Sequence, residues 1–283
     1  MFDVENLNKQ NDRNGMINKF ECVKAIFERA MSEFGLSKYV NNEMLQEIYS
    51  SIRVCHSNEK FVETYKENLT RKERESLSEF DIPMAFVNVE LNLIYIKYGT
   101  PIEVVVHEIV HSISNKLKKD TGIKEVMENY IREKGISLED EEFVIDSFNE
   151  AITHYITQLL IPEIKVSDGY NYGASIIGKY SNTLLECGRD SNLILDAYFK
   201  GNQQAFNSMG NDFKHIFEDV VVSINKARFW YLYKDARKVL SEEYINSIFE
   251  VIKTNLVAEN KVSIDNTAIG QVDEVDIQKG RKL

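Results

Sequence analysis

Apolar residues recur at three- and four-residue spacing along most of the chain, which predicts a mainly helical protein. The segments with this spacing, or with a charged helical composition, are 16–36, 42–54, 61–80, 100–122, 137–162, 174–185, 193–199, 213–233 and 242–257. Two shorter runs, Ala85 to Val87 and Leu93 to Tyr98, are strand-like and are separated by the polar residues Asn88, Glu90 and Asn92. They predict a short antiparallel pair, and the fold class is therefore α+β with helices dominant.

Breaks in this pattern divide the 283 residues into four segments. We expect an N-terminal helical segment (1–75), a central core with the strands and two helices (76–165), a C-terminal helical subdomain (166–258) and a polar tail (259–283). The sequence contains no internal repeat and no glycine-rich loop of the kind that binds phosphate.

The segment from Thr100 to Gly122 has both a start and a stop signal of a helix. Thr100 is predicted as the N-cap, Pro101 as the first helical residue and Glu103 as the partner in a capping box, while Gly122 follows a lysine-rich end. The predicted buried stripe consists of Val106, Ile109, Val110, Ile113 and Leu117.

This helix carries His107, Glu108 and His111 in the order H-E-x-x-H. Two histidines four residues apart project from the same side of a helix, so both imidazoles can reach one metal ion. The glutamate beside the first histidine can contact a water molecule on that metal without being a ligand. These residue types at this spacing indicate a zinc hydrolase.

A second motif lies in the predicted helix 137–162, where Asn149-Glu150-Ala151-Ile152-Thr153 matches the N-E-A-x-S/T pattern of gluzincins, the thermolysin-like zinc peptidases. The chain resembles that family between Ile94 and Leu160, apart from the connector between the two helices. The resemblance implies Zn²⁺ bound by His107, His111 and Glu150, with Glu108 as general base in peptide hydrolysis. It also implies a zincin-like core over 76–165, in which a small antiparallel sheet packs on the motif helix. In such cores an edge strand beside this helix binds the substrate backbone.

The chain departs from the family pattern at His154, where gluzincins have an aspartate that orients a ligand histidine. His154 has two possible roles: it orients a ligand, or it replaces Glu150 as the third ligand. The connector between His111 and Glu150 is also about twice the length found in thermolysin-like enzymes, although a longer loop costs little free energy. Such peptidases use a tyrosine or histidine to stabilise the oxyanion, and Tyr172 is the first candidate, followed by Tyr170 and His215.

Two other functions fit parts of the sequence. Residues 159–162, Leu-Leu-Ile-Pro, resemble the end of the glutamate helix in ImmA/IrrE-like regulatory peptidases, which cleave a repressor. A non-catalytic zincin-like binding module is the other alternative, although a purely structural metal site has no use for Glu108.

Composition limits the partners and the compartment. The net charge of −11 disfavours nucleic acid and anionic membranes as partners, so a peptide or protein substrate is expected. The three cysteines are widely spaced and form no C-x-x-C pair, which favours a reducing compartment. No apolar run is long enough to span a membrane and the N-terminus has no signal-peptide pattern, so we expect a cytoplasmic location.

Overall fold

A computed structural model describes residues 3–69, 71–77, 82–117, 138–162, 171–190, 192–201, 203–208, 243 and 246–258; side chains are not described for residues 72, 73, 76, 138–148, 171, 172, 203, 206 and 207. The chain forms two compact units. The first comprises Met1–Ser175 and Leu195–Gln203, and the second comprises Ile176–Ile194 and Gln204–Leu283. The domain boundaries predicted from the sequence stay predictions.

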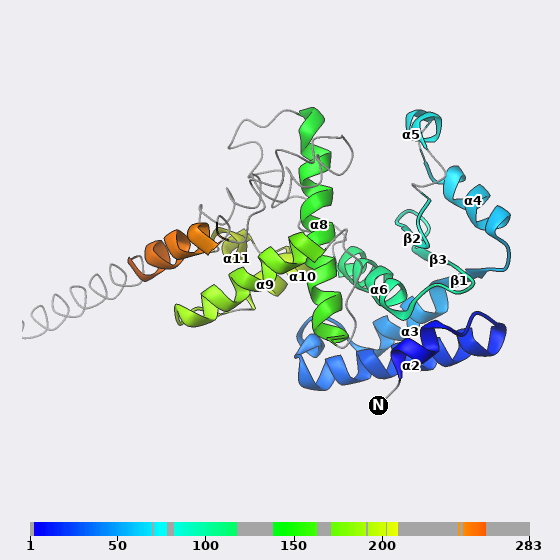
Figure 1. Ribbon diagram of the computed structural model, residues 1–283, viewed down its shortest axis with the longest axis horizontal. Coiled ribbons are helices and arrows are strands. Elements are labelled where there is room, and N and C mark those ends of the chain that lie inside the picture. The colour runs from blue at the N-terminus through cyan, green and yellow to red at the C-terminus, as the bar shows by residue number, and fades with distance from the viewer. Residues whose placement is uncertain are drawn as a thin grey trace, which may run out of the picture. The chain divides into compact units, whose positions relative to one another are not determined.

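The described chain is mainly helical, as predicted (Figure 1). Its helices are α1 (Val4–Asn8), α2 (Arg13–Glu33), the short 3₁₀ helix η1 (Leu36–Lys38), α3 (Asn42–Ser51), α4 (Asn58–Glu67), α5 (Arg71–Ser76), α6 (Ile102–Leu117), α8 (Leu138–Leu160), α9 (Asn171–Glu186), α10 (Leu193–Lys200) and α11 (Gln203–Ser208). Residues 246–258 are also helical, close to the predicted 242–257. The predicted helix 213–233 and the tail 259–283 lie outside the described residues.

The first unit contains a three-stranded sheet in the order β1-β3-β2, formed by β1 (Ile52–Cys55), β2 (Ala85–Asn88) and β3 (Leu93–Lys97). The predicted antiparallel pair is confirmed in β2 and β3. The prediction of a purely antiparallel sheet is wrong, because β1 lies parallel to β3 and the sheet is mixed. Residues 52–54 were expected to continue a helix. They form a strand because β-branched Ile52 and Val54 pair with Ile94 and Ile96, both fully buried in β3.

Helix α6 lies between the sheet and α8 (Figure 1). It packs on β2 and β3 and also contacts α2, α3 and α8. Four of the five residues predicted as its buried stripe are buried, namely Val106, Ile109, Val110 and Ile113, while Leu117 is half-buried. Gly99, at φ 80°, turns the chain from β3 toward this helix in a conformation that other residues rarely adopt. The sequence pattern thus predicted the buried face correctly.

The predicted capping box at the start of α6 is wrong. The Thr100 hydroxyl donates to the carbonyl oxygens of Met84, at 3.1 Å, and Lys97, at 2.8 Å, so it is turned toward the sheet and does not accept from the helix. The helix begins at Ile102, not at Pro101. Thr100 is fully buried, and its hydroxyl satisfies the strand carbonyls that the turn exposes.

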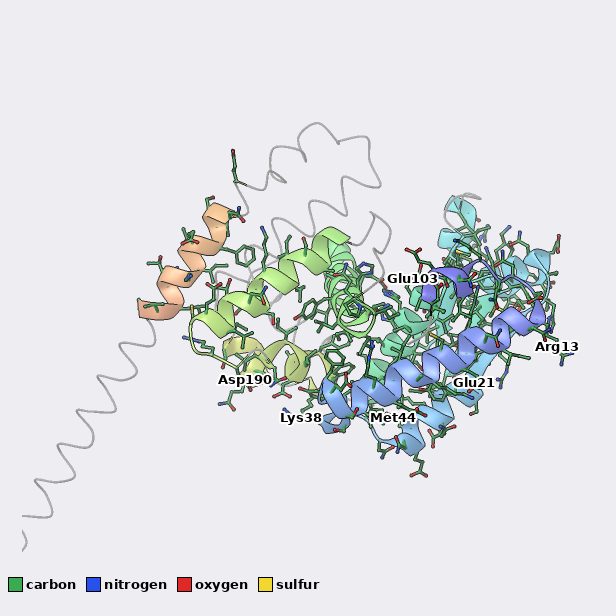
Figure 2. All side chains as sticks on the ribbon, turned by 60° about the horizontal axis from the view of Figure 1, so that its bottom comes forward. Arg13, Glu21, Lys38, Met44, Glu103 and Asp190 are labelled. Carbon is green, nitrogen blue, oxygen red and sulfur yellow. The ribbon has the colours of Figure 1, made fainter. Side chains whose placement is uncertain are left out.

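Asn8, at the end of α1, supplies the missing cap from a distant part of the chain. Its Oδ1 accepts from the backbone N–H of Ile102 at 2.8 Å, and its Nδ2 donates to Glu103 Oε2 at 2.8 Å. Figure 2 shows Glu103 beside the short helix α1. The Asn8 side chain therefore satisfies one N–H of the first turn of α6 and also holds Glu103 in place. A negatively charged residue such as Glu103 is favourable at the N-terminus of a helix.

Replacing Asn8 with alanine should lower the free energy of unfolding by about 1 kcal/mol, the usual contribution of an N-cap. Urea denaturation followed by circular dichroism measures the change. Asn18→Ala is the matched control, because the Asn18 side chain donates an exposed hydrogen bond to the side chain of Gln10. Equal stability of the Asn8→Ala protein and the wild type would contradict the assigned cap.

The second unit is built around one face of α9 and the helix 246–258. Lys179 Nζ donates to Asn246 Oδ1 at 2.7 Å, and Lys253 pairs with Glu186 at 2.6 Å. The buried side chains of this unit include Ile177, Tyr180, Leu184, Phe249, Ile252 and Leu256. The apolar periodicity of both segments therefore produces a shared core, as expected for amphipathic helices.

Candidate metal centre

Helices α6 and α8 pack side by side and bring together the three residues predicted as metal ligands (Figure 1). His107 Nε2 lies 3.1 Å from Glu150 Oε2, and His111 Nε2 lies 3.0 Å from Glu150 Oε1. The two Nε2 atoms are 3.0 Å apart. Helical spacing fixes the two histidines relative to each other, whereas Glu150 reaches them only through the packing of the two helices.

This donor set fits a divalent cation. His107, His111 and Glu150 each offer one ligand atom, and these atoms all lie within 4.8 Å of one another. In a tetrahedral zinc site with bonds of about 2.0–2.1 Å, ligand atoms are separated by about 3.4 Å. The observed separations of 3.0–3.1 Å would open by only a few tenths of an ångström. Without a cation, a hydrogen bond between the two Nε2 atoms requires one of them to carry a proton and the other to accept it.

The centre is accessible from solvent on its carboxylate side. The Glu150 side chain retains 31% exposure, against 14% for His107 and 11% for His111. Burial alone would raise the pKa of Glu150, but the charge of His111 and hydrogen bonds from both imidazoles hold it well below its usual range. Glu150 is therefore anionic at neutral pH and offers a charged oxygen ligand.

Glu108 follows His107 on α6 and has a different electrostatic environment. Burial raises the pKa of its carboxyl group from 4.5 to about 7; the charge of Glu150 adds to this effect, and His107 opposes it. A carboxyl group with a pKa near neutrality can both accept and release a proton at physiological pH. Glu108 thus has the property that a general acid–base requires.

The raised pKa of Glu108 predicts a pH-dependent loss of stability in the metal-free protein. The folded state binds the proton of Glu108 more tightly than the unfolded state, so its stability falls as pH rises from 4.5 to about 7. Glu108→Gln removes this effect and should be more stable than wild type above pH 7, by on the order of 3 kcal/mol, with little difference below pH 4.5. Urea denaturation in the presence of a chelator, at a series of pH values, measures it. A constant stability difference between the two proteins across that range would contradict the assigned environment.

The second nitrogen of His111 faces α8. Its Nδ1 lies 3.2 Å from Thr153 Oγ1 and 3.4 Å from the Asn149 side-chain amide. Thr153 Oγ1 is in turn 2.5 Å from the hydroxyl of Tyr198 on α10. Sequence reasoning included Asn149 and Thr153 in the motif but missed Tyr198, because one tyrosine among fourteen carries no spacing signal.

His154 lies beside the donor set and is not part of it. It is buried, and its ring contacts that of His107 edge-on, with the centroids 6.0 Å apart. Among the residues that the structure describes, the group able to hold a metal contains Glu150 and not His154. This arrangement favours the first of the two roles considered for His154, which is to support a ligand histidine.

The predicted oxyanion residues are not located. Tyr172 is the second residue of α9, but its side chain lies outside what the structure describes. Tyr170 and His215 also fall outside the described residues. The assignment of Tyr172 stays a prediction.

Comparisons of the chain with protein-family models, with curated proteins and with solved structures found no significant match. The resemblance to gluzincins therefore stays a prediction from the two motifs. No helix within the described ranges is both long enough and apolar enough to cross a membrane.

Proposed function

We propose that the chain is a zinc-dependent peptidase of the zincin type, with His107, His111 and Glu150 as ligands and Glu108 as general base. The observation that carries the proposal is the convergence of two imidazole nitrogens and one carboxylate, with donor atoms 3.0–3.1 Å apart. Two histidines and a glutamate leave one position of a tetrahedral zinc open for water or substrate, which is the arrangement of catalytic sites. The partial exposure of Glu150 supports access to that position.

The side chains of the centre divide the chemistry between them. Zinc would supply a Lewis acid that polarises a carbonyl group and lowers the pKa of a water molecule. Glu150 contributes the negative charge of the ligand set, because it stays ionised at neutral pH. Glu108 takes the proton of the attacking water and passes it to the leaving amine, roles that require a pKa near the working pH. A purely structural metal site would not require such a carboxyl group, which favours an enzyme over a binding module.

Strand β2 supports an extended peptide as the substrate. It is an edge of the sheet, packs on α6, and within the described residues pairs only with β3. The backbone N–H of Lys97 donates to the Met84 carbonyl at 3.1 Å, so Met84 and Lys97 form a hydrogen-bonded pair. Hydrogen-bonded pairs alternate along an antiparallel ladder, and the backbone groups of Ala85 and Val87 therefore point away from β3. A peptide could pair with these groups as an added strand. Exposed apolar side chains flank the strand at Met84, Val89 and Leu91.

The test of this proposal is metal content followed by cleavage. Purified protein is stripped with a chelator, reloaded with Zn²⁺ and analysed for bound metal; about one zinc per chain is expected. The loaded and stripped proteins are then incubated with an unfolded protein mixture, and new peptide termini are identified by mass spectrometry. We expect new termini only with the loaded protein. Failure to bind zinc would overturn the proposal, and zinc binding without cleavage would favour the binding module.

A further inference from the structure

The turn between β2 and β3 carries two exposed apolar side chains. The last pair of the two strands joins Asn88 to Leu93, so the turn, here called the hairpin tip, consists of residues 89–92. Val89 is 64% exposed and Leu91 61%, more than any other large apolar side chain among the residues that the structure describes. Turns are usually built from glycine, proline, asparagine, aspartate or serine, which suit the backbone of a turn. The geometry of the turn therefore does not explain why Val89 and Leu91 are apolar.

The hairpin tip is held in one conformation by the side chain of Asn88, which is buried although it is polar. Its Oδ1 accepts from the backbone N–H of Leu91 at 2.7 Å, and its Nδ2 donates to Oδ1 of Asn68, the C-cap of α4. Asn92, at φ 55°, takes the left-handed conformation that returns the chain into β3. The apolar side chains of the tip are thus carried by a fixed backbone, and a preorganised surface loses less conformational entropy on binding.

The hairpin tip continues the edge of the sheet that the proposed peptidase offers to a peptide. The ring of Phe86 packs against those of Phe61 and Tyr65 on α4. Successive side chains of a strand alternate between the faces of the sheet, so Val87 lies on the other face, on which α6 packs. Val89 follows two residues later, about 7 Å along the strand direction. A polypeptide that pairs with Val87 as an added strand therefore reaches the tip within about two residues.

The size and charge of the hairpin tip favour a single polypeptide segment over other ligands. Glu90 lies between the two apolar residues and is exposed, which disfavours an anionic lipid surface. A specific interface between two folded proteins buries at least about 1,000 Å². Two side chains at a turn provide only a small part of that area, whereas they are enough to cover one apolar side chain of an extended polypeptide.

We propose that the hairpin tip is a subsite that determines specificity, in which Val89 and Leu91 contact an apolar side chain of an extended polypeptide paired with β2. This inference rests on the proposed function and names its substrate class. The substrates are unfolded or locally extended polypeptides that carry apolar side chains and are longer than the four residues of β2. A polar peptide pairs with the same strand but gains no binding energy from the tip.

The test is the binding of fluorescently labelled β-casein, an unfolded apolar polypeptide, to full-length protein stripped of metal, measured by anisotropy with a chelator present. The double variant Val89→Ser, Leu91→Ser should bind about tenfold more weakly, because the contact loses its apolar area. Val251→Ser is the matched control: it makes the same change at a valine that is 57% exposed in the second unit, and it should bind like wild type. Equal affinity of the double variant and wild type, or no binding by wild type, would overturn the inference.

Two further measurements separate this inference from its alternatives. For an apolar peptide cleaved by the zinc-loaded protein, the double variant should raise KM about tenfold and leave kcat nearly unchanged, since the tip contributes binding and no chemistry. A dimer that sedimentation detects in wild type and not in the double variant would assign the tip to a second copy of the chain and overturn the inference. Absence of zinc binding or cleavage by wild type would reject the proposed function, while casein binding by the stripped protein would still decide the role of the tip.

Discussion

Glu108→Gln should lower peptide hydrolysis by on the order of a thousandfold, within the range that general acid–base catalysis contributes. Glutamine keeps the size and polarity of the side chain but cannot accept or release a proton. His107, His111 and Glu150 are unchanged, so the variant should still bind one zinc per chain. Parallel measurements of turnover on a cleaved peptide and of zinc content give the two readouts.

The control for this variant is Glu103→Gln. Glu103 lies in the first turn of the same helix, and its contact is with Asn8 at the helix start. The same chemical change at this position should leave hydrolysis near the wild-type rate. Substantial turnover in Glu108→Gln would reject Glu108 as the base, and loss of zinc from that variant would show that the substitution disturbed the centre itself.

His111→Ala and Glu150→Ala should each weaken zinc binding by more than about a hundredfold, because changes to residues that only orient ligands already cost 10–100-fold. Each variant removes one of the donor atoms that lie 3.0 Å apart in the folded chain. Elemental analysis after reloading and gel filtration provides the measurement. Hydrolysis should be lost in parallel, since the open coordination position needs the complete ligand set.

His154→Gln discriminates between the two possible third ligands. His154 contacts the ring of His107 but lies outside the donor set, so this variant should retain most of its zinc. Zinc kept in Glu150→Ala and lost in His154→Gln would make His154 the ligand. That outcome would also remove the main support for the gluzincin resemblance.

The parts of the structure that could be predicted from the sequence are those that depend on neighbours along the chain. Helical periodicity predicted the buried face of α6, and alternation predicted the β2–β3 pair. The pairing of β1 with β3 was missed because a four-residue strand following a helix has almost no periodicity of its own. The cap by Asn8 was missed because it joins residues 94 apart in sequence.

The same distinction applies to the site. The four-residue spacing of His107 and His111 predicted their common direction from helix geometry alone. Glu150 was found only through a motif resemblance, since nothing in the spacing indicates that α6 and α8 pack together. The contact between Thr153 and Tyr198 could not be predicted, because the two residues are 45 apart in sequence and meet only through tertiary packing.

The unit that contains the candidate metal centre is discontinuous in sequence, because it takes up residues 195–203 after the chain has passed through residues 176–194 of the second unit. During synthesis, the histidines and Glu150 leave the ribosome before the helix that carries Tyr198. The contact between Thr153 and Tyr198 is therefore made only when α10 folds back onto the first unit. A nascent or truncated chain that ends at the predicted core boundary near residue 165 would contain all three candidate ligands but would lack the buried tyrosine hydroxyl that contacts Thr153.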